Sequence, residues 1–208
     1  IVQARMGSTR LPKKVMMKIN GIPMIELLLK RLFLSKELDQ IVLATSSDKS
    51  NISMVEHVQS LGFDCLCGSE NDVLKRYADV IKKYKAEIVV RITGDCPLID
   101  SLLVDECIRA FKESNIDYLC NVNPPTFPDG LDIQVTSAAA LLDADLNSKD
   151  VFEREHVMPY IINSKKYKSM PFKYKEDLSA NRWTVDENKD FLLIKQIYKH
   201  FHPNIYFS

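Results

Sequence analysis

No run of the 208 residues approaches the roughly 18 consecutive apolar side chains that a membrane-spanning helix needs, so we expect no membrane partner. A surplus charge of either sign is also missing, because 28 basic residues offset 28 acidic ones. This balance removes the general positive field that holds DNA or RNA, so we expect no nucleic-acid partner and only local phosphate binding. The first residues do not form a basic segment followed by an apolar core and a cleavage site, and we therefore expect a cytoplasmic protein.

Cysteine is present, but not in a pattern that indicates disulfides or zinc. There is no C-x-x-C pair and no histidine at zinc-ligand spacing among the five cysteines, which are Cys65, Cys67, Cys96, Cys107 and Cys120. We expect reduced thiols. Cys96 falls in a polar loop of interest, where a small buried thiol is favoured over a reactive one.

Short apolar runs alternate with helical patterns of ten to fifteen residues through the first half of the chain. The expected strands are residues 1–4, 40–45, 63–66 and 87–92, and the expected helices are 23–34, 51–61, 71–84 and 100–112. This alternation predicts an α/β fold with a doubly wound, mostly parallel sheet. Ligands of such sheets bind beyond the carboxyl ends of the strands, where three polar loops (4–14, 45–48 and 93–97) would meet.

The rhythm changes after residue 117, and we expect a small antiparallel and helical extension. Its expected elements are a strand at 131–136, a helix at 151–163, a strand at 182–185 and a final helix at 190–201. At this length we expect a single domain over residues 1–208, with halves at 1–118 and 119–208.

The loop at residues 4–14 concentrates cations, hydroxyls and one glycine immediately after the first predicted strand. Gly7 lets the backbone approach an anion, Ser8 and Thr9 offer donors, and Arg5 and Arg10 can neutralise phosphate oxygens together with Lys14. The pattern matches neither a Walker loop nor a dinucleotide fingerprint. A triphosphate site is the favoured interpretation, and a solvated basic turn is the alternative.

Asp95 follows the apolar run at 88–92 directly, in the sequence Thr93-Gly94-Asp95-Cys96-Pro97. A carboxylate at the carboxyl end of a strand faces the ligand crevice and suits Mg²⁺. Helix capping is the alternative role, but Asp100 is better placed for it.

Three stretches together carry a family resemblance: residues 3–12 (QARMGSTRLP), 91–100 (RITGDCPLID) and 128–132 (PDGLD). They resemble the spore-coat polysaccharide biosynthesis protein F group of the cytidylyltransferase family, which also contains the CMP-sialate and CMP-ketodeoxyoctulosonate synthetases. The resemblance extends to about residue 195. It implies a Rossmann-like nucleotidyltransferase domain that uses CTP and Mg²⁺ to attach CMP to the anomeric hydroxyl of an acidic sugar, releasing pyrophosphate.

The resemblance also implies roles for individual residues. Arg10, Lys14 and Asp95 would be catalytic, and Asp95 with Asp186 would hold the metal. We expect the nucleotide site to comprise Ala4, Arg5, Gly7, Ser8, Thr9, Thr45, Ser69, Arg76, Thr93 and Gly94. Thr45 and Ser69 are included because they lie in polar loops beyond strands, and Arg76 because it follows the second of these loops by one helical turn. The sequence departs from the pattern at Thr184, where relatives often have aspartate, and at Lys13, where glycine is usual and a left-handed backbone would strain lysine.

The sugar site is expected in the second half, on Asn121, Asp132, Gln134, Glu155 and His156, with Arg91 reaching in from the first half. Arg154 could also offer donors to an acidic sugar. Residues 153–156 could equally be a charged surface helix, and Ser69 could equally cap a helix. Residues 160–174 are aromatic and could form a homodimer contact.

Two other functions fit a nucleotide-binding α/β chain. A sugar-nucleotide glycosyltransferase would share the fold, but such enzymes usually hold their metal with a D-x-D motif, and none follows a strand here. A non-enzymatic nucleotide-binding module is disfavoured by the retained cationic loop and both metal-site aspartates.

Overall fold

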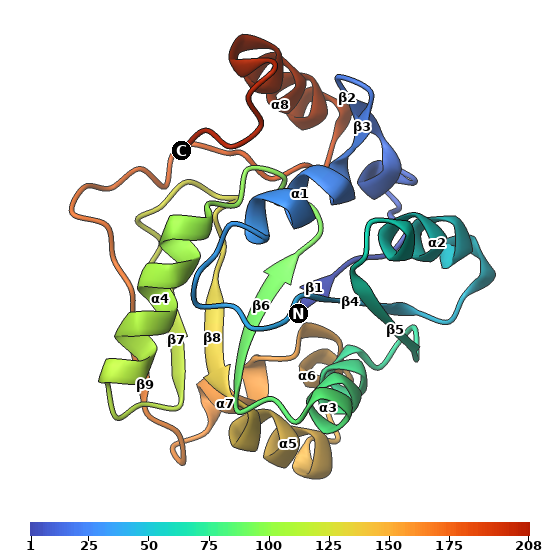
Figure 1. Ribbon diagram of the computed structural model, residues 1–208. Coiled ribbons are helices and arrows are strands. Elements are labelled where there is room, and N and C mark those ends of the chain that lie inside the picture. Colours follow the sequence, from blue (N-terminus) through green and yellow to red (C-terminus); the bar gives the residue numbers. More distant parts are fainter.

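The computed structural model describes all residues from 1 to 208 and is built on one seven-stranded sheet (Figure 1). The strand order is β5-β4-β1-β6-β8-β7-β9. The strands are β1 (Val2–Gln3), β4 (Val42–Ser46), β5 (Asp64–Gly68), β6 (Ile88–Thr93), β7 (Tyr118–Cys120), β8 (Gln134–Ser137) and β9 (Ser169–Pro171). A separate antiparallel pair consists of β2 (Lys18–Ile19) and β3 (Ile22–Pro23).

The four strands β5, β4, β1 and β6 are parallel, whereas β8 runs antiparallel to both of its neighbours. The chain moves from β1 outward to β4 and β5, and then returns to β6 on the other side of β1. The direction of winding therefore reverses between β1 and β6, which is where open α/β sheets form their ligand crevice.

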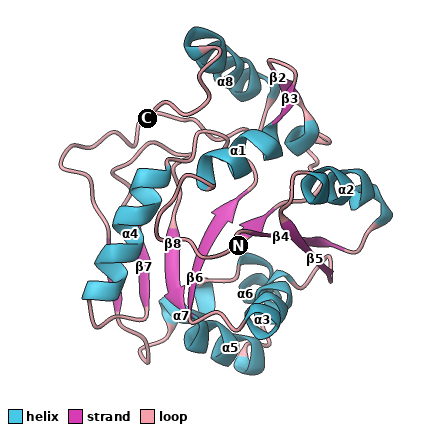
Figure 2. Ribbon diagram, in the orientation of Figure 1, coloured by secondary structure: helices cyan, strands magenta, loops and turns pink.

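Helices cover both faces of the sheet (Figure 2). On one face α1 (Met24–Leu32), α2 (Ile52–Ser60) and α4 (Ser101–Glu113) share a core of 22 buried apolar residues with the strands. On the other face α3 (Val73–Tyr84), α5 (Ala138–Asn147) and α7 (Pro159–Asn163) share a core of 14. The short α6 (Val151–His156) packs against α3 on this second face. The doubly wound α/β fold expected from the sequence is confirmed.

The last helix, α8 (Asn188–Phe201), packs with the β2–β3 pair beyond the sheet, at the top of Figure 1. The hydroxyl of Tyr198 donates to the carbonyl oxygen of Pro97 at 2.7 Å. The helix begins with a capping box, in which Asp190 accepts hydrogen bonds from the backbone N–H groups of Asp186 and Glu187. This cap fixes the backbone that leads into the helix, and Asp186 is part of it.

The second half of the chain differs from the sequence-based prediction in three places. The helix expected over 151–163 is two helices, because Val157 takes a positive φ of 73° and Pro159 starts α7. The strand expected at 182–185 is wrong, since that segment makes one isolated bridge between Asp129 and Arg182. The strand expected from residue 131 begins only at Gln134.

Several elements were not anticipated: the β2–β3 pair, β7, α5 and β9. A signal for α5 was present in the sequence, because Ser137 precedes an alanine- and leucine-rich segment and its hydroxyl accepts from the backbone N–H of Ala140. The other strands have two or three residues each and carry no readable period.

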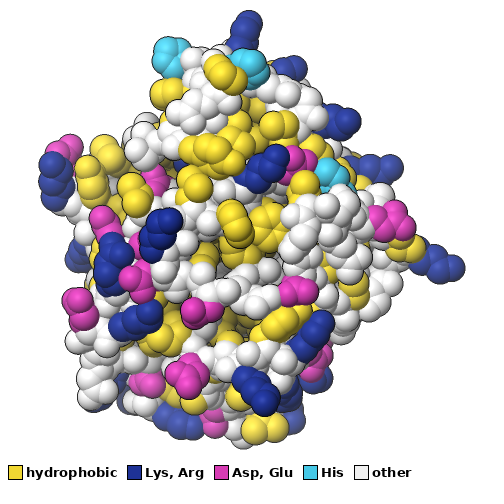
Figure 3. Space-filling view, viewed as in Figure 1, with side chains coloured by type: hydrophobic (Ala, Val, Ile, Leu, Met, Phe, Trp, Pro, Cys, Tyr) yellow, Lys and Arg dark blue, Asp and Glu magenta, His cyan; other side chains and the backbone are white.

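Basic and acidic side chains are interspersed over the face shown in Figure 3. This distribution agrees with the zero net charge of the chain. None of the helices combines the length and the apolar character required to cross a membrane.

Candidate nucleotide-binding site

A polar cavity of about 510 Å³ opens at the carboxyl ends of β1 and β6, where the winding reverses. It is lined by residues from the first loop, the start of α3, the loop after β6, α6 and the segment before α8. The predicted site residues that it brings together are Ala4, Arg5, Gly7, Ser8, Thr9, Arg10, Lys14, Arg76, Thr93, Gly94, Asp95, Glu155, His156 and Asp186.

Buried Met6 anchors the first loop. Its backbone N–H donates to Oδ1 of Asn51 at 2.8 Å, and its carbonyl oxygen accepts from the backbone N–H groups of Ser8 and Lys13. Lys13 has φ 59° and ψ 20°. It therefore adopts the left-handed conformation that glycine takes easily and lysine takes only with strain. The turn therefore carries local backbone strain at Lys13.

The tip of this loop presents unpaired backbone donors. The N–H groups of Gly7, Thr9 and Arg10 donate to no acceptor within the protein, and all three residues line the cavity. Such a run of free N–H groups binds anionic oxygens well. The guanidinium of Arg10, whose side chain is 61% exposed, lies at the same end of the cavity.

Lys14 lies between the two candidate metal ligands. Its Nζ donates to Oδ2 of Asp95 at 2.9 Å, to Oδ1 of Asp186 at 3.0 Å and to the carbonyl oxygen of Val185 at 2.7 Å. The side chain is only 10% exposed. Residues that are 91 positions apart in the sequence thus converge on one ammonium group, on the same side of the cavity as the cationic loop.

Asp186 is surrounded by cations. Besides Lys14, Arg10 approaches its Oδ1 at 3.0 Å, and Arg182 donates to its Oδ2 at 2.7 Å. Burial acts to raise the pKa of Asp186, but the hydrogen bond and charge of Lys14, supported by Arg182 and Arg10, outweigh it and lower the pKa. The carboxylate is therefore held ionised.

The backbone fixes the spacing of this arrangement. Val185 donates its N–H to the carbonyl oxygen of Asp95 at 2.8 Å, which ties the loop after β6 to the segment before α8. Gly94 lies so close to the end of β1 that a Cβ added there would be 2.6 Å from the Cβ of Ala4. Only glycine allows this approach of the two cavity-lining loops.

The donor set of Asp95 and Asp186 is compatible with Mg²⁺. No three acidic, histidine or cysteine side chains are arranged so that they could hold a metal ion, so the protein would supply two carboxylate ligands. Because the two oxygens share Lys14 Nζ as a neighbour, they are at most roughly 6 Å apart, a span that a hard cation with additional water or phosphate ligands can bridge. Lys14 would have to leave for the ion to enter.

Two other predicted nucleotide residues lie outside the cavity lining. Thr45 is fully buried in β4 and its Oγ1 has no hydrogen-bond partner. Ser69 is exposed and accepts the backbone N–H of Asp72, which itself caps α3. Arg76 lines the cavity but is almost fully buried, and its guanidinium donates to the carbonyl oxygens of Ser69 and Glu70. It holds the 69–70 turn in place.

The predicted sugar residues divide into separate groups. Glu155 and His156 are exposed and line the cavity. Arg91 donates to Gln134 at 2.6 Å and to Gln3 at 3.3 Å, forming a polar row across β8, β6 and β1 that reaches the cavity at Gln3.

The remaining sugar-site candidates have other surroundings. Asn121 is buried, and its amide bonds the backbone of Leu131 and Ile133, so it shapes the 131–133 segment and is not available to a ligand. Arg154 is engaged by Asp72 and Asp145. Burial raises the pKa of Asp132, against the opposing hydrogen bond from the backbone of Gly130.

Cys96 is buried beside the site, and burial raises the pKa of its thiol well above the ordinary value. All five cysteines are free thiols. The structure therefore agrees with a packing role for Cys96, because a protonated, enclosed thiol is a poor nucleophile.

Three side chains that sequence reasoning did not single out shape the site. Asn51 anchors the first loop, Glu70 pairs with Arg5 at 3.0 Å, and Arg182 joins Asp186 to Asp129. Arg182 stands four residues before Asp186, but the segment is not helical, so this spacing did not indicate the pair. The partners of Asn51 and Glu70 are 45 and 65 residues away along the chain, beyond any local pattern.

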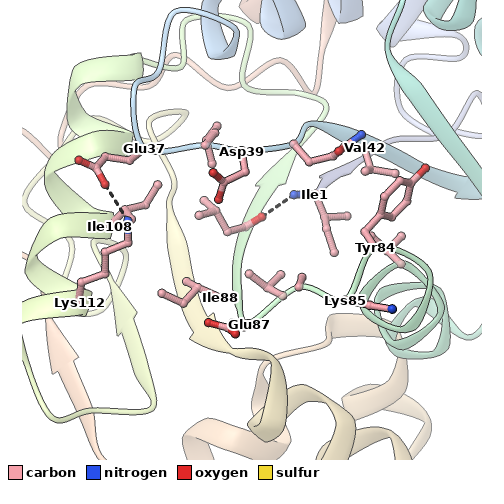
Figure 4. Close-up of a pocket in the computed structure, with 16 residues that line it drawn as sticks. Ile1, Glu37, Asp39, Val42, Tyr84, Lys85, Glu87, Ile88, Ile108 and Lys112 are labelled. Atoms are coloured by element: carbon pink, nitrogen blue, oxygen red, sulfur yellow. Dashed lines mark hydrogen bonds and ion pairs between the residues drawn. The ribbon is translucent and has the colours of Figure 1, made fainter.

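A second cavity, of about 520 Å³, lies at the opposite, amino-terminal ends of β4 and β6 (Figure 4). Its lining is mostly apolar, and the amino group of Ile1 donates there to the carbonyl oxygen of Val90. Its Lys112 is already paired with Glu37. It offers neither the cation cluster nor the paired carboxylates of the first cavity, so we do not assign the chemistry to it.

The sheet order, the crevice at the winding reversal and the cationic loop in contact with two carboxylates define a nucleotidyltransferase-type domain. The family model described as cytidylyltransferase matches residues 1–202, and the chain belongs to this family. It is therefore a nucleotidyltransferase.

Comparisons with individual proteins agree. The spore coat polysaccharide biosynthesis protein SpsF of Bacillus subtilis is 33% identical over 207 residues, which cover 96% of this chain and 85% of that protein. The structure of a cytidylyltransferase from Leptospira borgpetersenii superposes with a TM-score of 0.95 at 34% identity, over 100% of this chain and 88% of that one. A CMP:2-keto-3-deoxy-manno-octonic acid synthetase complexed with CTP, at 17% identity, shares the fold with a TM-score of 0.75 over 96% and 97% of the two chains.

Proposed function

We propose that this protein transfers the cytidylyl group of CTP to the anomeric hydroxyl of an acidic sugar of the 2-keto-3-deoxy type, for surface polysaccharide biosynthesis. The observation that carries the proposal is the convergence of Asp95 and Asp186 on Lys14 beside a loop with free backbone N–H groups. Relatives whose names state this chemistry, such as the CTP-bound synthetase, support the choice of substrates.

The loop is suited to bind the triphosphate. Its free N–H groups at Gly7, Thr9 and Arg10 can donate to phosphate oxygens, and the exposed guanidinium of Arg10 can pair with them. Placing these donors in advance is how enzymes stabilise the charge that develops in phosphoryl transfer.

In the reaction, the anomeric oxygen forms a bond to the α-phosphorus while the bond from that phosphorus to the bridging oxygen breaks. Pyrophosphate leaves, and the hydroxyl proton passes to water. Asp95 and Asp186 would hold Mg²⁺, which when bound would neutralise charge on the phosphates. No protein nucleophile is required, and the buried thiol of Cys96 offers none.

We propose that the acidic sugar binds on the side of the cavity formed by α6 and the row of Gln3, Arg91 and Gln134. Exposed Glu155 and His156 contribute from α6, and Arg91 is the cation of the row, so its guanidinium would pair with a sugar carboxylate. The assignment leaves out Asn121 and Arg154, because both are already engaged by other groups of the protein.

The test is pyrophosphate release from CTP with a panel of 2-keto-3-deoxy acids, compared with neutral aldose 1-phosphates. We expect turnover with at least one keto acid and none with sugar 1-phosphates. Robust turnover with a sugar 1-phosphate would place the protein among a different group of nucleotidyltransferases. Release of a nucleoside monophosphate or diphosphate from a sugar nucleotide, with no pyrophosphate, would indicate a glycosyltransferase instead.

A further inference from the structure

All three hydrogens of the Lys14 ammonium have acceptors within the protein: Asp95, Asp186 and the carbonyl oxygen of Val185. The side chain is 10% exposed. The space between the two carboxylates is therefore filled by a positive charge that belongs to the chain itself. Together with Arg10 and Arg182 at Asp186, this ammonium pairs both carboxylates without any added ion.

A divalent cation bound by the same oxygens would occupy the same space. Magnesium and manganese hold carboxylate oxygens at about 2.0 to 2.2 Å, whereas Nζ of Lys14 lies 2.9 and 3.0 Å from them. An ammonium and a metal ion this close would also repel each other strongly. Metal and Lys14 cannot share the position, so one must leave when the other enters.

A displaced ammonium needs another anion, since leaving it unpaired in a largely buried position is costly. Of the other acidic residues around the site, Glu70 is paired with Arg5, Asp190 caps α8, and Glu155 is an exposed residue of α6. Lys14 lines the open cavity together with the loop of Gly7 to Arg10. The phosphates of a nucleotide placed there would be the acceptor.

We propose that Lys14 acts as a resident cation for Asp95 and Asp186, and that a divalent metal enters this pair together with the nucleotide and not before it. The inference rests on the proposed function for the identity of the nucleotide. It adds an order of assembly: the nucleotide-free protein holds metal weakly at this pair, and the nucleotide phosphates receive the ammonium as the metal enters.

The carboxylate pair should survive removal of Lys14, which makes the proposal testable. The spacing is fixed by the hydrogen bond from Val185 to Asp95, and the backbone N–H of Asp186 is held by Asp190 at 2.9 Å. Lys14→Met keeps most of the side-chain volume and removes the charge. It should leave an open two-carboxylate site that a metal can fill.

In the experiment each protein is titrated with Mn²⁺ alone, without nucleotide or sugar. Electron paramagnetic resonance measures the free Mn²⁺ at each step, and the dissociation constant follows from it. Arg10→Met is the matched control, because Arg10 contacts the same Oδ1 of Asp186 at 3.0 Å but is 61% exposed and touches no second carboxylate. We expect Lys14→Met to bind Mn²⁺ at least about tenfold more tightly than wild type, and Arg10→Met at most about threefold more tightly. Adding Asp95→Asn to Lys14→Met should abolish the gain.

Equal affinities of wild type and Lys14→Met would overturn the proposal, and so would equal gains in Lys14→Met and Arg10→Met, which would indicate a general charge effect. If Lys14→Met does not fold, the Mn²⁺ affinity of the wild-type protein tests the proposal by itself. Tight nucleotide-free Mn²⁺ binding that Asp95→Asn removes would contradict a resident cation, and weak binding would support it. These titrations contain no substrate. Their result therefore does not depend on whether the protein transfers a cytidylyl group to a sugar, and the two proposals can fail separately.

Discussion

The backbone N–H of Val185 donates to the carbonyl oxygen of Asp95 at 2.8 Å and thereby joins two segments that the sequence separates by 90 positions. One segment follows β6 and the other precedes α8. The hydrogen bond sets the side chains of Asp95 and Asp186 on the same side of the cavity, each in contact with Lys14. The proposed chemistry depends on this contact.

Replacing either carboxylate by its amide should remove activity while leaving the fold intact. In Asp95→Asn or Asp186→Asn, the site loses a charge that holds the metal, and we expect turnover to fall by about 100-fold or more. Lys14 keeps its other carboxylate and the carbonyl oxygen of Val185, so the melting temperature should change by no more than about 3 °C.

Asp100→Asn is the matched control for these amide variants. Asp100 caps α4 through the backbone N–H groups of Leu102 and Leu103, and asparagine caps equally well. Activity should be unchanged in this variant. Full activity in Asp95→Asn would contradict the assignment of the site.

Arg10→Ala should weaken CTP binding without affecting stability. The guanidinium is 61% exposed and its pair with Asp186 contributes little to folding, but opposite a phosphate it makes a charge-assisted hydrogen bond. Such a bond contributes about 1.5 to 3 kcal/mol, so the Kd measured by calorimetry should rise about 10- to 150-fold. Lys18→Ala, an exposed lysine in β2 outside the cavity, should leave the Kd unchanged. Equal CTP affinity in Arg10→Ala and wild type would remove this loop from the site.

Lys13→Gly should stabilise the protein. Lys13 holds φ 59°, a conformation that costs an L-residue about 1 to 2 kcal/mol and glycine almost nothing, while the added freedom of glycine in the unfolded chain offsets part of the gain. We expect a net rise of about 0.5 to 1 kcal/mol in the free energy of unfolding, measured by denaturant titration. Lys85, which follows α3, has the same left-handed conformation, so Lys85→Gly is the variant with which the stability of Lys13→Gly is compared. A loss of stability in Lys13→Gly alone would mean that the lysine side chain holds the loop.

The sequence predicted the parts of the molecule that follow from local patterns. Buried runs such as 88–92 indicated parallel strands, and polar residues after them indicated a shared rim, because carboxyl ends of parallel strands meet at one edge. The unusual Lys13 could be recognised because glycine is usual at this position, which indicates a possible positive φ, and Lys13 has φ 59°.

The parts that failed depend on contacts distant in sequence. The break after α6 requires a positive φ at Val157, which a β-branched residue adopts only when tertiary packing imposes it. Asn121 is predicted in the sugar site, yet its amide hydrogen-bonds the backbone of Leu131 and Ile133, which are ten and twelve residues away. The resident position of Lys14 between two aspartates could not be read from a pattern, since the three residues lie on three separate segments.

Thiol reagents should modify the protein without inactivating it. Burial raises the pKa of Cys96 well above its ordinary value and that of Cys65 to about 11, so both stay protonated at pH 7.5, whereas Cys67 is exposed. Iodoacetamide should therefore label Cys67 first by mass spectrometry, with activity retained, and Cys67→Ser should lose that label. Inactivation that parallels labelling of Cys96 would give this thiol a role that the structure does not indicate.

The central claim is that the anomeric oxygen of an acidic sugar attacks the α-phosphorus of CTP in the cavity beside Lys14. The most direct measurement follows a 2-keto-3-deoxy acid carrying ¹⁸O at its anomeric hydroxyl through the reaction with CTP, by mass spectrometry of the products. The account predicts that ¹⁸O remains in the CMP-sugar, as the bridge between sugar and phosphorus, and that the released pyrophosphate contains none. A CMP-sugar without the label, or CMP released free while the sugar is unchanged, would contradict it.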